Sequence, residues 1–521
     1  MSKHIAKRAM SMSAASFIVR ILGFIRDMIL AGFLGATGLS DAFFVAFRIP
    51  NLLREIFAEG SMSSGLIPVL SSVHKNKGEG EAVIVVRVVF TFIVVFVGLV
   101  TIAGVIFSPY IVRLIAPGFE VDSMKFDITV ILTRIMFPFL FFVSLAALNM
   151  GALNVKKVFF IPALSSAWYN LSIITFALVC AMFTFEPVIV VAVAVTVGGM
   201  MQYLFQLPAF FRKGYSIYPL FKFSHPDFKR IGSLILPATV GMAAAQLNIF
   251  ISTILASFLA IGSITYLYYA MRLIQFPIGI FGVAVGMASL ATLSDHAANG
   301  DYDKLAVDFA FSLKFLLMLA IPSMVGLIML RQPIITTLFQ HGAFDASACE
   351  GTQSALVYYS VGLWAMIGTR PITSAFYSMQ NTALPVKIAS ISFLSNIFLS
   401  IILLEPMHHN GLALATSCSS VINFLLLFYF LNKTIKNINI KDILMSVIKV
   451  SIAAALMGLV AYGASGLVAW TAAGGTAFKG FALFLIILAC GATFFVAALL
   501  LKCEGMASLL RMFKRTVGDT E

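Results

Sequence analysis

Apolar segments long enough to cross a bilayer recur along nearly the whole chain, and this recurrence limits the fold more than any other feature. Of the 521 residues, 60% are hydrophobic and only 11% are charged, which excludes a soluble domain. We therefore predict an all-α, polytopic membrane protein. Because a transmembrane helix needs about 20 apolar residues, we predict about fourteen spans, at 12–34, 42–73, 84–110, 129–153, 159–182, 187–210, 231–259, 264–294, 305–329, 352–380, 384–404, 410–432, 443–465 and 478–501.

Basic residues outside these spans predict the orientation of the chain. With the N-terminus inside, most lysines and arginines fall in inner loops, and the outer loops hold only Arg113, Lys125, Arg331 and Lys479. The positive-inside rule then predicts an even number of spans with both termini in the cytoplasm. The net charge of +13 is explained by this asymmetry, which we favour over binding to nucleic acid.

The sequence contains no signature of catalysis, metal binding or a cleaved leader. The first apolar segment carries Arg20, Arg26 and Asp27 without a small-residue cleavage pattern, so we expect it to remain in the protein. The five cysteines lack CxxC spacing, and phosphate-loop, nucleophile-elbow and HExxH motifs are absent. We therefore predict a protein that is not an enzyme and has no metal or cofactor, driven by an ion gradient, the membrane potential or substrate flow.

Weak similarity between the two halves indicates an internal duplication. Residues 29–34 match 254–259, and 46–49 parallel 270–273, at a common offset of about 224 residues. An even number of spans separates the copies, which predicts parallel repeats related by a pseudo-two-fold axis along the membrane normal, enclosing a central cavity. The predicted parts are a six-helix lobe at 1–222, a second six-helix lobe at 223–440, and two further helices with a tail at 441–521.

Four arginines lie inside otherwise apolar segments: Arg20 and Arg26 in the first, Arg54 in the second and Arg272 in the eighth. A guanidinium group stays protonated, so each must face water or a fixed anion. We hypothesise that all four converge on one anionic headgroup, and their forked donors suit phosphate. Arg272 is the strongest candidate, because no acidic residue lies within a helical turn of it.

Acidic residues in the first two spans leave an alternative open. Asp27 is predicted to orient its neighbour Arg26, Asp41 lies near the outer mouth, and Glu59 follows in a stretch where a gate can form hydrogen bonds. Glycines and a proline interrupt these spans, so this hairpin is the predicted moving gate. Alternatively, Asp27, Asp41, Glu55 and Glu59 pair with the arginines as bridges between helices.

Other polar residues within spans support weaker hypotheses. A small cation site is one interpretation of Gln246, Asn248, Asn396, Thr416 and Asn423, and hydrogen bonding between helices is the other. Three further cations lie in or near spans, namely Arg134, Lys314 and Arg370. The side chain of Lys314 can snorkel, and Arg370 precedes Pro371, where it can cap interrupted backbone.

Several ordered motifs resemble the MurJ (MviN) family of bacterial lipid II flippases, within the MOP exporter superfamily. They are the stretches 20–27 (RILGFIRD), 41–54 (DAFFVAFRIPNLLR), 57–60 (FAEG), 268–273 (YYAMRL) and 339–342 (FQHG). The resemblance implies two six-helix lobes and two C-terminal helices that line a groove for the lipid tail. It also implies that Arg20, Arg26, Arg54 and Arg272 are the essential cavity arginines, and that Asp41 and Glu59 match acidic positions of functional interest. This chain departs from some relatives at Met271 and Gln275, where those have acids.

The function implied by this resemblance is translocation of lipid II from the inner to the outer leaflet of the bacterial inner membrane by alternating access. The expected partners are lipid II, membrane lipids and the cell-wall synthesis machinery, with a monovalent ion or the membrane potential as energy source. The alternatives are a flippase for another polyprenyl-diphosphate-linked oligosaccharide, a multidrug antiporter of the same superfamily and a scaffold that transports nothing. A cationic cavity disfavours cationic drugs.

Overall fold

The protein is helical throughout the part that its computed structural model describes, residues 2–55, 65–182, 186–435, 437–471, 475–503 and 505, where no β-strand occurs. Ten helical segments of this part are long and apolar enough to cross a membrane. Every predicted span overlaps one helix or several consecutive helices. The predicted all-α polytopic membrane fold is confirmed, and about fourteen spans remain the expected number.

Contacts divide the chain into two compact units. Unit 1 contains the residues up to Ile264 together with His341–Phe344, and unit 2 contains Thr265–Gln340 and the chain from Asp345 onward. The helix that spans residues 226–256 therefore packs within unit 1, although the internal repeat assigns it to the second predicted lobe. A division by contacts and a division by repeat differ in kind, so the predicted lobes remain a prediction.

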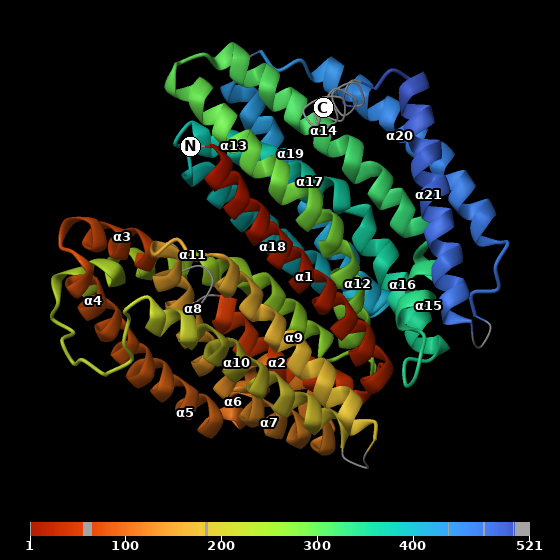
Figure 1. Cartoon of the computed structure of the whole chain (residues 1–521). Helices are drawn as coiled ribbons and strands as arrows, with labels where there is room; N and C mark the ends of the chain where they lie inside the picture. Colours follow the sequence, from red (N-terminus) through yellow and green to blue (C-terminus); the bar gives the residue numbers. More distant parts are fainter. Residues whose placement is uncertain are drawn as a thin grey trace. The chain divides into compact units, whose positions relative to one another are not determined.

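Unit 1 is built from helices that range from 5 to 33 residues in length (Figure 1). Thr37 begins the second helix with a capping box, in which its hydroxyl and that of Ser40 each bond to the other residue's backbone N–H. The elements are α1 (Ser2–Leu34), α2 (Gly38–Arg54), α3 (Ile67–Asn76), α4 (Glu79–Phe92), η3 (Ile93–Val97), α5 (Gly98–Ile106), α6 (Ser108–Ile115), η4 (Pro117–Val121), α7 (Ser123–Met136), α8 (Pro138–Val155), α9 (Phe160–Cys180), α10 (Pro187–Arg212) and α11 (Pro226–Ala256).

The packing of unit 1 brings the two arginine-bearing helices against a common layer. Helix α1 packs on α9, α9 and α8 pack on α10, and α2 packs on α7 and α8. Both α1 and α2 are continuous helices, and α2 runs through Pro50. The bends that the glycines and proline were expected to permit therefore do not interrupt the described helices.

Unit 2 follows the same pattern. Asp301, Asp345 and Asn439 each accept a hydrogen bond from a backbone N–H three residues on and so begin a helix. The elements are α12 (Ser263–Pro277), η5 (Ile278–Gly282), α13 (Val283–Ala298), α14 (Tyr302–Met329), α15 (Arg331–Phe339), α16 (Ala346–Val361), α17 (Leu363–Ser378), α18 (Ala383–Met407), α19 (His409–Thr434), α20 (Ile440–Ser465) and α21 (Thr476–Leu500). The first two residues of α12 are the last of unit 1.

Helices α20 and α21 form a pair at the end of the chain (Figure 1). The pair is attached to unit 2 by packing of α20 against α14 and of α21 against α15. Lys314 of α14 donates a hydrogen bond to the Asp442 carboxylate of α20, 2.6 Å away. Lys314, expected to snorkel, is therefore a buried partner in an ion pair that fixes the start of α20.

Candidate functional site

Arg26 is held in one orientation by residues of two helices. Its Nε and Nη2 donate to Asp27 Oδ1 at 3.0 and 2.6 Å, and its Nη1 donates to Asn170 Oδ1 of α9 at 3.1 Å. The guanidinium carbon lies 5.5 Å from the centre of the Tyr169 ring. Asn170 is itself oriented, because its Nδ2 donates to the carbonyl oxygen of Val19. The predicted role of Asp27 in orienting Arg26 agrees with this geometry.

Arg54 lies at the end of α2 in a second polar network. Its Nε donates to Asn51 Oδ1 at 3.1 Å, and its Nη2 lies 3.8 Å from Glu55 Oε1. Glu55 also accepts hydrogen bonds from Asn51 and from Gln246 of α11. A quarter of the Arg54 side chain is exposed, compared with one-tenth of the Arg26 side chain. The guanidinium of Arg54 is therefore more accessible to a ligand than that of Arg26.

Arg20 and Arg26 lie on different faces of α1. Six positions in an α-helix correspond to a rotation of about 120° relative to the starting face. The uninterrupted helix accordingly leaves Arg20 exposed while Arg26 is buried. A common ligand would therefore reach these two arginines from different sides of the helix.

Arg272 belongs to unit 2, where it lies on α12 and is partly buried. The preceding turn of this helix is aromatic: the Tyr269 ring packs against Phe339 of α15 with a centroid distance of 4.9 Å and is fully buried. This packing fixes the helix that carries Arg272. Convergence of Arg272 with the three arginines of unit 1 on one ligand stays a prediction.

Asp41 is a buried carboxylate that links three segments of unit 1. Its Oδ2 accepts a hydrogen bond from the backbone N–H of Gly262 at 2.8 Å and lies 3.4 Å from Lys125 Nζ of α7. The same ammonium group lies 4.0 Å from the centre of the Phe119 ring. Asp41 thus pairs with Lys125, a residue predicted from the sequence to lie in an outer loop. Glu59, predicted as a gate residue, lies outside the described residues.

The polar residues of the predicted cation site are distributed over both units. Gln246 and Asn248 lie on α11 of unit 1, whereas Asn396, Thr416 and Asn423 lie on α18 and α19 of unit 2. Asn396 joins the latter two helices, because its Nδ2 donates to the hydroxyls of Thr416 and Ser419. These contacts match the alternative interpretation, hydrogen bonding between helices. A cation site at these residues stays a prediction.

One group of potential metal ligands, Glu81, His225 and Asp227, occurs in the described part of the chain. His225 Nε2 lies 3.0 Å from Glu81 Oε1, and Asp227 Oδ2 accepts a hydrogen bond from Lys77 Nζ at 2.7 Å. A positively charged ammonium group within the cluster opposes cation binding. The arrangement is an ion-pair network that joins α3 and α4 to the start of α11.

Sequence reasoning missed Asn170 and Lys125, which position the predicted site residues. Neither carries a signal in the sequence, because a lone asparagine or loop lysine is ordinary in a membrane protein and its partner lies 84 or more positions away. Arg134, another weak candidate, donates a hydrogen bond to the hydroxyl of Ser108 at 2.9 Å. That contact gives Arg134 a structural role.

Comparison with known proteins places these residues in a family. A profile described as "Lipid II flippase MurJ" matches residues 30–481. A protein of Buchnera aphidicola subsp. Schizaphis graminum named "Probable lipid II flippase MurJ" is 36% identical over 84% of this chain and 86% of its own length. One from Burkholderia cenocepacia, named "Lipid II flippase MurJ", is 33% identical over 81% of this chain and 83% of its own.

Solved structures agree with the sequence relatives. One titled "Lipid II flippase MurJ, inward closed conformation" has a TM-score of 0.77 and 28% identity, covering 94% of this chain and 97% of that one. A multidrug resistance MATE family transporter of the MOP superfamily in an inward-facing conformation has a TM-score of 0.65 at 14% identity, covering 82% of this chain and 98% of its own. The second similarity concerns the fold alone.

Proposed function

Because the chain belongs to the lipid II flippase MurJ family, we propose that it carries lipid II from the inner to the outer leaflet of the bacterial inner membrane by alternating access. The observation that carries the proposal is the family match over residues 30–481, which includes Arg54 and Arg272. Flipping a lipid requires no covalent chemistry, so the protein acts as a transporter and not as an enzyme.

The arginines supply the chemistry that this substrate needs. The lipid II headgroup is attached through a diphosphate, and each charge-assisted hydrogen bond from a guanidinium to phosphate contributes about 1.5–3 kcal/mol. Asp27 and Asn170 orient the Arg26 donors, and the network around Glu55 orients those of Arg54. Oriented donors lose little rotamer freedom when the substrate binds, which favours Arg26 and Arg54 as diphosphate contacts.

We further propose that both termini lie in the cytoplasm, because the lysines and arginines concentrate in the alternate loops expected there. The lipid tail then stays in the membrane or along the pair α20 and α21. A monovalent ion or the membrane potential returns the empty carrier, at about 2.3 kcal/mol per charge per 100 mV. The cell-wall synthesis machinery is the partner that consumes the product.

Transport of a fluorescent lipid II across proteoliposomes tests the proposal. We expect wild-type protein to flip lipid II and not an apolar cationic drug, and Arg272→Ala to lower the rate strongly. Arg272→Lys should be nearly as slow if forked geometry matters. The matched control is Arg212→Ala, since Arg212 is an exposed arginine at the end of α10. Wild-type vesicles that flip another polyprenyl-diphosphate-linked sugar but not lipid II would contradict the proposal.

A further inference from the structure

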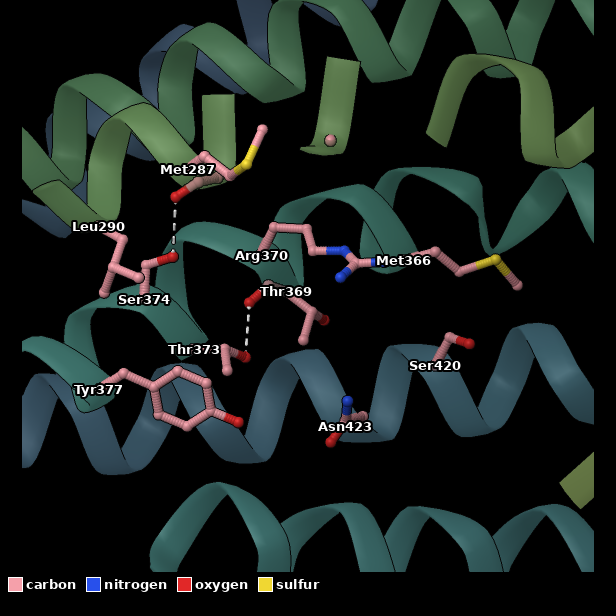
Figure 2. Close-up of a pocket in the computed structure, with 12 residues that line it drawn as sticks. Met287, Leu290, Met366, Thr369, Arg370, Thr373, Ser374, Tyr377, Ser420 and Asn423 are labelled. Carbon is pink, nitrogen blue, oxygen red and sulfur yellow. Dashed lines mark hydrogen bonds between the residues drawn. The ribbon is translucent and has the colours of Figure 1, made fainter. Parts of the chain in front are cut away.

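Unit 2 contains a cavity of about 440 Å³ between η5, α13, α17 and α19 (Figure 2). This volume is within the range of about 300–1,000 Å³ that small-molecule sites occupy. Polar and apolar side chains share its wall: Arg370, Thr369 and Thr373 come from α17, Asn423 from α19, and Met287 and Met366 provide apolar surface. The cavity therefore combines one charged group with a surface that suits aliphatic atoms.

Arg370 supplies the charge of this cavity. Its side chain is exposed, and it has neither a hydrogen bond nor an ion pair with any residue that the structure describes. Two glycines lie beside the aliphatic part of this side chain, since a Cβ built on Gly282 or Gly286 would lie 3.7 or 3.5 Å from its Cγ or Cβ. The five N–H donors of the guanidinium are thus available to an anion, and nothing in the wall neutralises it.

The threonine hydroxyls of α17, the helix that carries Arg370, present hydrogen-bond acceptors to the cavity. Thr373 and Thr369 donate their hydroxyl hydrogens to the carbonyl oxygens of Thr369 and Ala365, at 3.0 and 2.8 Å. Their oxygens can therefore only accept further hydrogen bonds. A ligand that satisfies this wall carries N–H donors near its negative charge.

From this arrangement we infer that the cavity binds a peptide through a free carboxylate, with Arg370 as the anion contact. A peptide matches each part of the wall: its carboxylate meets the guanidinium, its amide N–H groups meet the threonines, and its aliphatic side chains meet the methionines. A diphosphate does not, because Arg370 is the one cation in the wall and a diphosphate carries more than one charge. The inference rests on the proposed function, since it assigns the cavity to the peptide of lipid II.

Binding of soluble peptides to the full chain in nanodiscs tests the inference by surface plasmon resonance. The probes are the pentapeptide of lipid II with free carboxylates and the same peptide with its carboxylates amidated. We expect the acid form to bind wild type at least about tenfold more tightly than the amide form. Arg370→Gln should abolish this difference, whereas Arg54→Gln and the control Arg212→Gln should preserve it.

The inference is overturned if the acid and amide peptides bind wild type equally, if neither binds, or if Arg370→Gln retains the preference for the acid. Thr373→Val provides a second variant, because it removes an acceptor and keeps the charge; it should weaken both peptides by a similar factor. Failure of the inference is distinguishable from failure of the proposed function. Wild-type vesicles can flip lipid II when no peptide binds, and the peptide can bind when Arg54→Gln has stopped transport.

Discussion

The carboxylate of Asp41 accepts a hydrogen bond of 2.8 Å from the backbone N–H of Gly262, and this contact ties the first turn of α2 to the connection between α11 and α12. Gly262 has a φ of +90°, a conformation that other residues rarely adopt. The connection leads directly into α12, which carries Arg272. Within unit 1, Asp41 therefore anchors the connection that precedes α12 to the helix that carries Arg54.

Removing the Asp41 carboxylate should destabilise unit 1 strongly. Asp41→Ala leaves a buried N–H and the buried ammonium of Lys125 without this acceptor, and the loss of one partner of a buried pair costs about 3–5 kcal/mol. Asp41→Asn keeps an acceptor and should cost less. Thermal unfolding in detergent measures both, with Lys125→Met as the variant that removes the ammonium group and keeps the hydrogen bond from Gly262 to Asp41. Equal losses for Asp41→Ala and Asp41→Asn would contradict the role assigned to this contact.

Transport should depend on Asn170, although the residue was not predicted as a site residue. Asn170→Ala removes the acceptor of Arg26 Nη1 and should lower the rate of lipid II flipping about tenfold, the effect of losing one hydrogen bond to a charged group. Ser172→Ala is the matched control, because Ser172 lies on the same helix and donates to the carbonyl oxygen of Ala194 instead. An unchanged rate in Asn170→Ala would show that Arg26 needs no support from α9.

The segment His341–Phe344 should lose its place on α1 when Gly342 is replaced. Ala343 N donates to the Gly32 carbonyl oxygen at 2.7 Å, and a Cβ on Gly342 would lie 2.2 Å from that oxygen. Gly214 is a close control: its φ of +81° also lies in the left-handed region, but no atom lies within 4 Å of a built Cβ.

We expect Gly214→Ala to cost about 1 kcal/mol of strain. Gly342→Ala should cost clearly more, because the backbone of α1 cannot move aside, and proteolysis after residue 340 should become faster. Melting temperatures in detergent and limited proteolysis compare the two variants. Similar melting temperatures for both would indicate strain alone and no packing against α1.

Stability at alkaline pH should depend on Tyr215. Burial, with a smaller contribution from Glu79, raises the pKa of this phenol to about 12, and its hydroxyl has no hydrogen-bond partner among the described residues. The unfolded chain ionises near pH 10 and the folded protein near 12, so stability is present below pH 10 and is lost as the pH rises between these values. Tyr215→Phe should remove this part of the loss and change stability little at pH 7. A melting temperature that falls equally in both proteins above pH 10 would argue against it.

Hydropathy and charge predicted the helices well but not their contacts. Runs of apolar residues are local signals, so the spans could be placed from the chain itself. The contacts of Asp41 with Gly262 and of Arg26 with Asn170 join positions 221 and 144 apart. Such pairs depend on how helices pack, which hydropathy does not encode. The cavity around Arg370 was missed for the same reason, since residues of η5, α13, α17 and α19 form it together.

The π-helical turn η5 determines the orientation of α12, which carries Arg272, relative to α13, which lines the cavity near Arg370. One extra residue in a helical turn rotates the helix on its N-terminal side by about 100° relative to the helix on its C-terminal side. The arginine and tyrosine side chains of α12 thus point in directions that a straight α-helix from Ser263 to Ala298 would not give them. Deleting a single residue between Ile278 and Gly282 would rotate the guanidinium of Arg272 to a different face of the helix, while the orientation of Gly286 stayed the same.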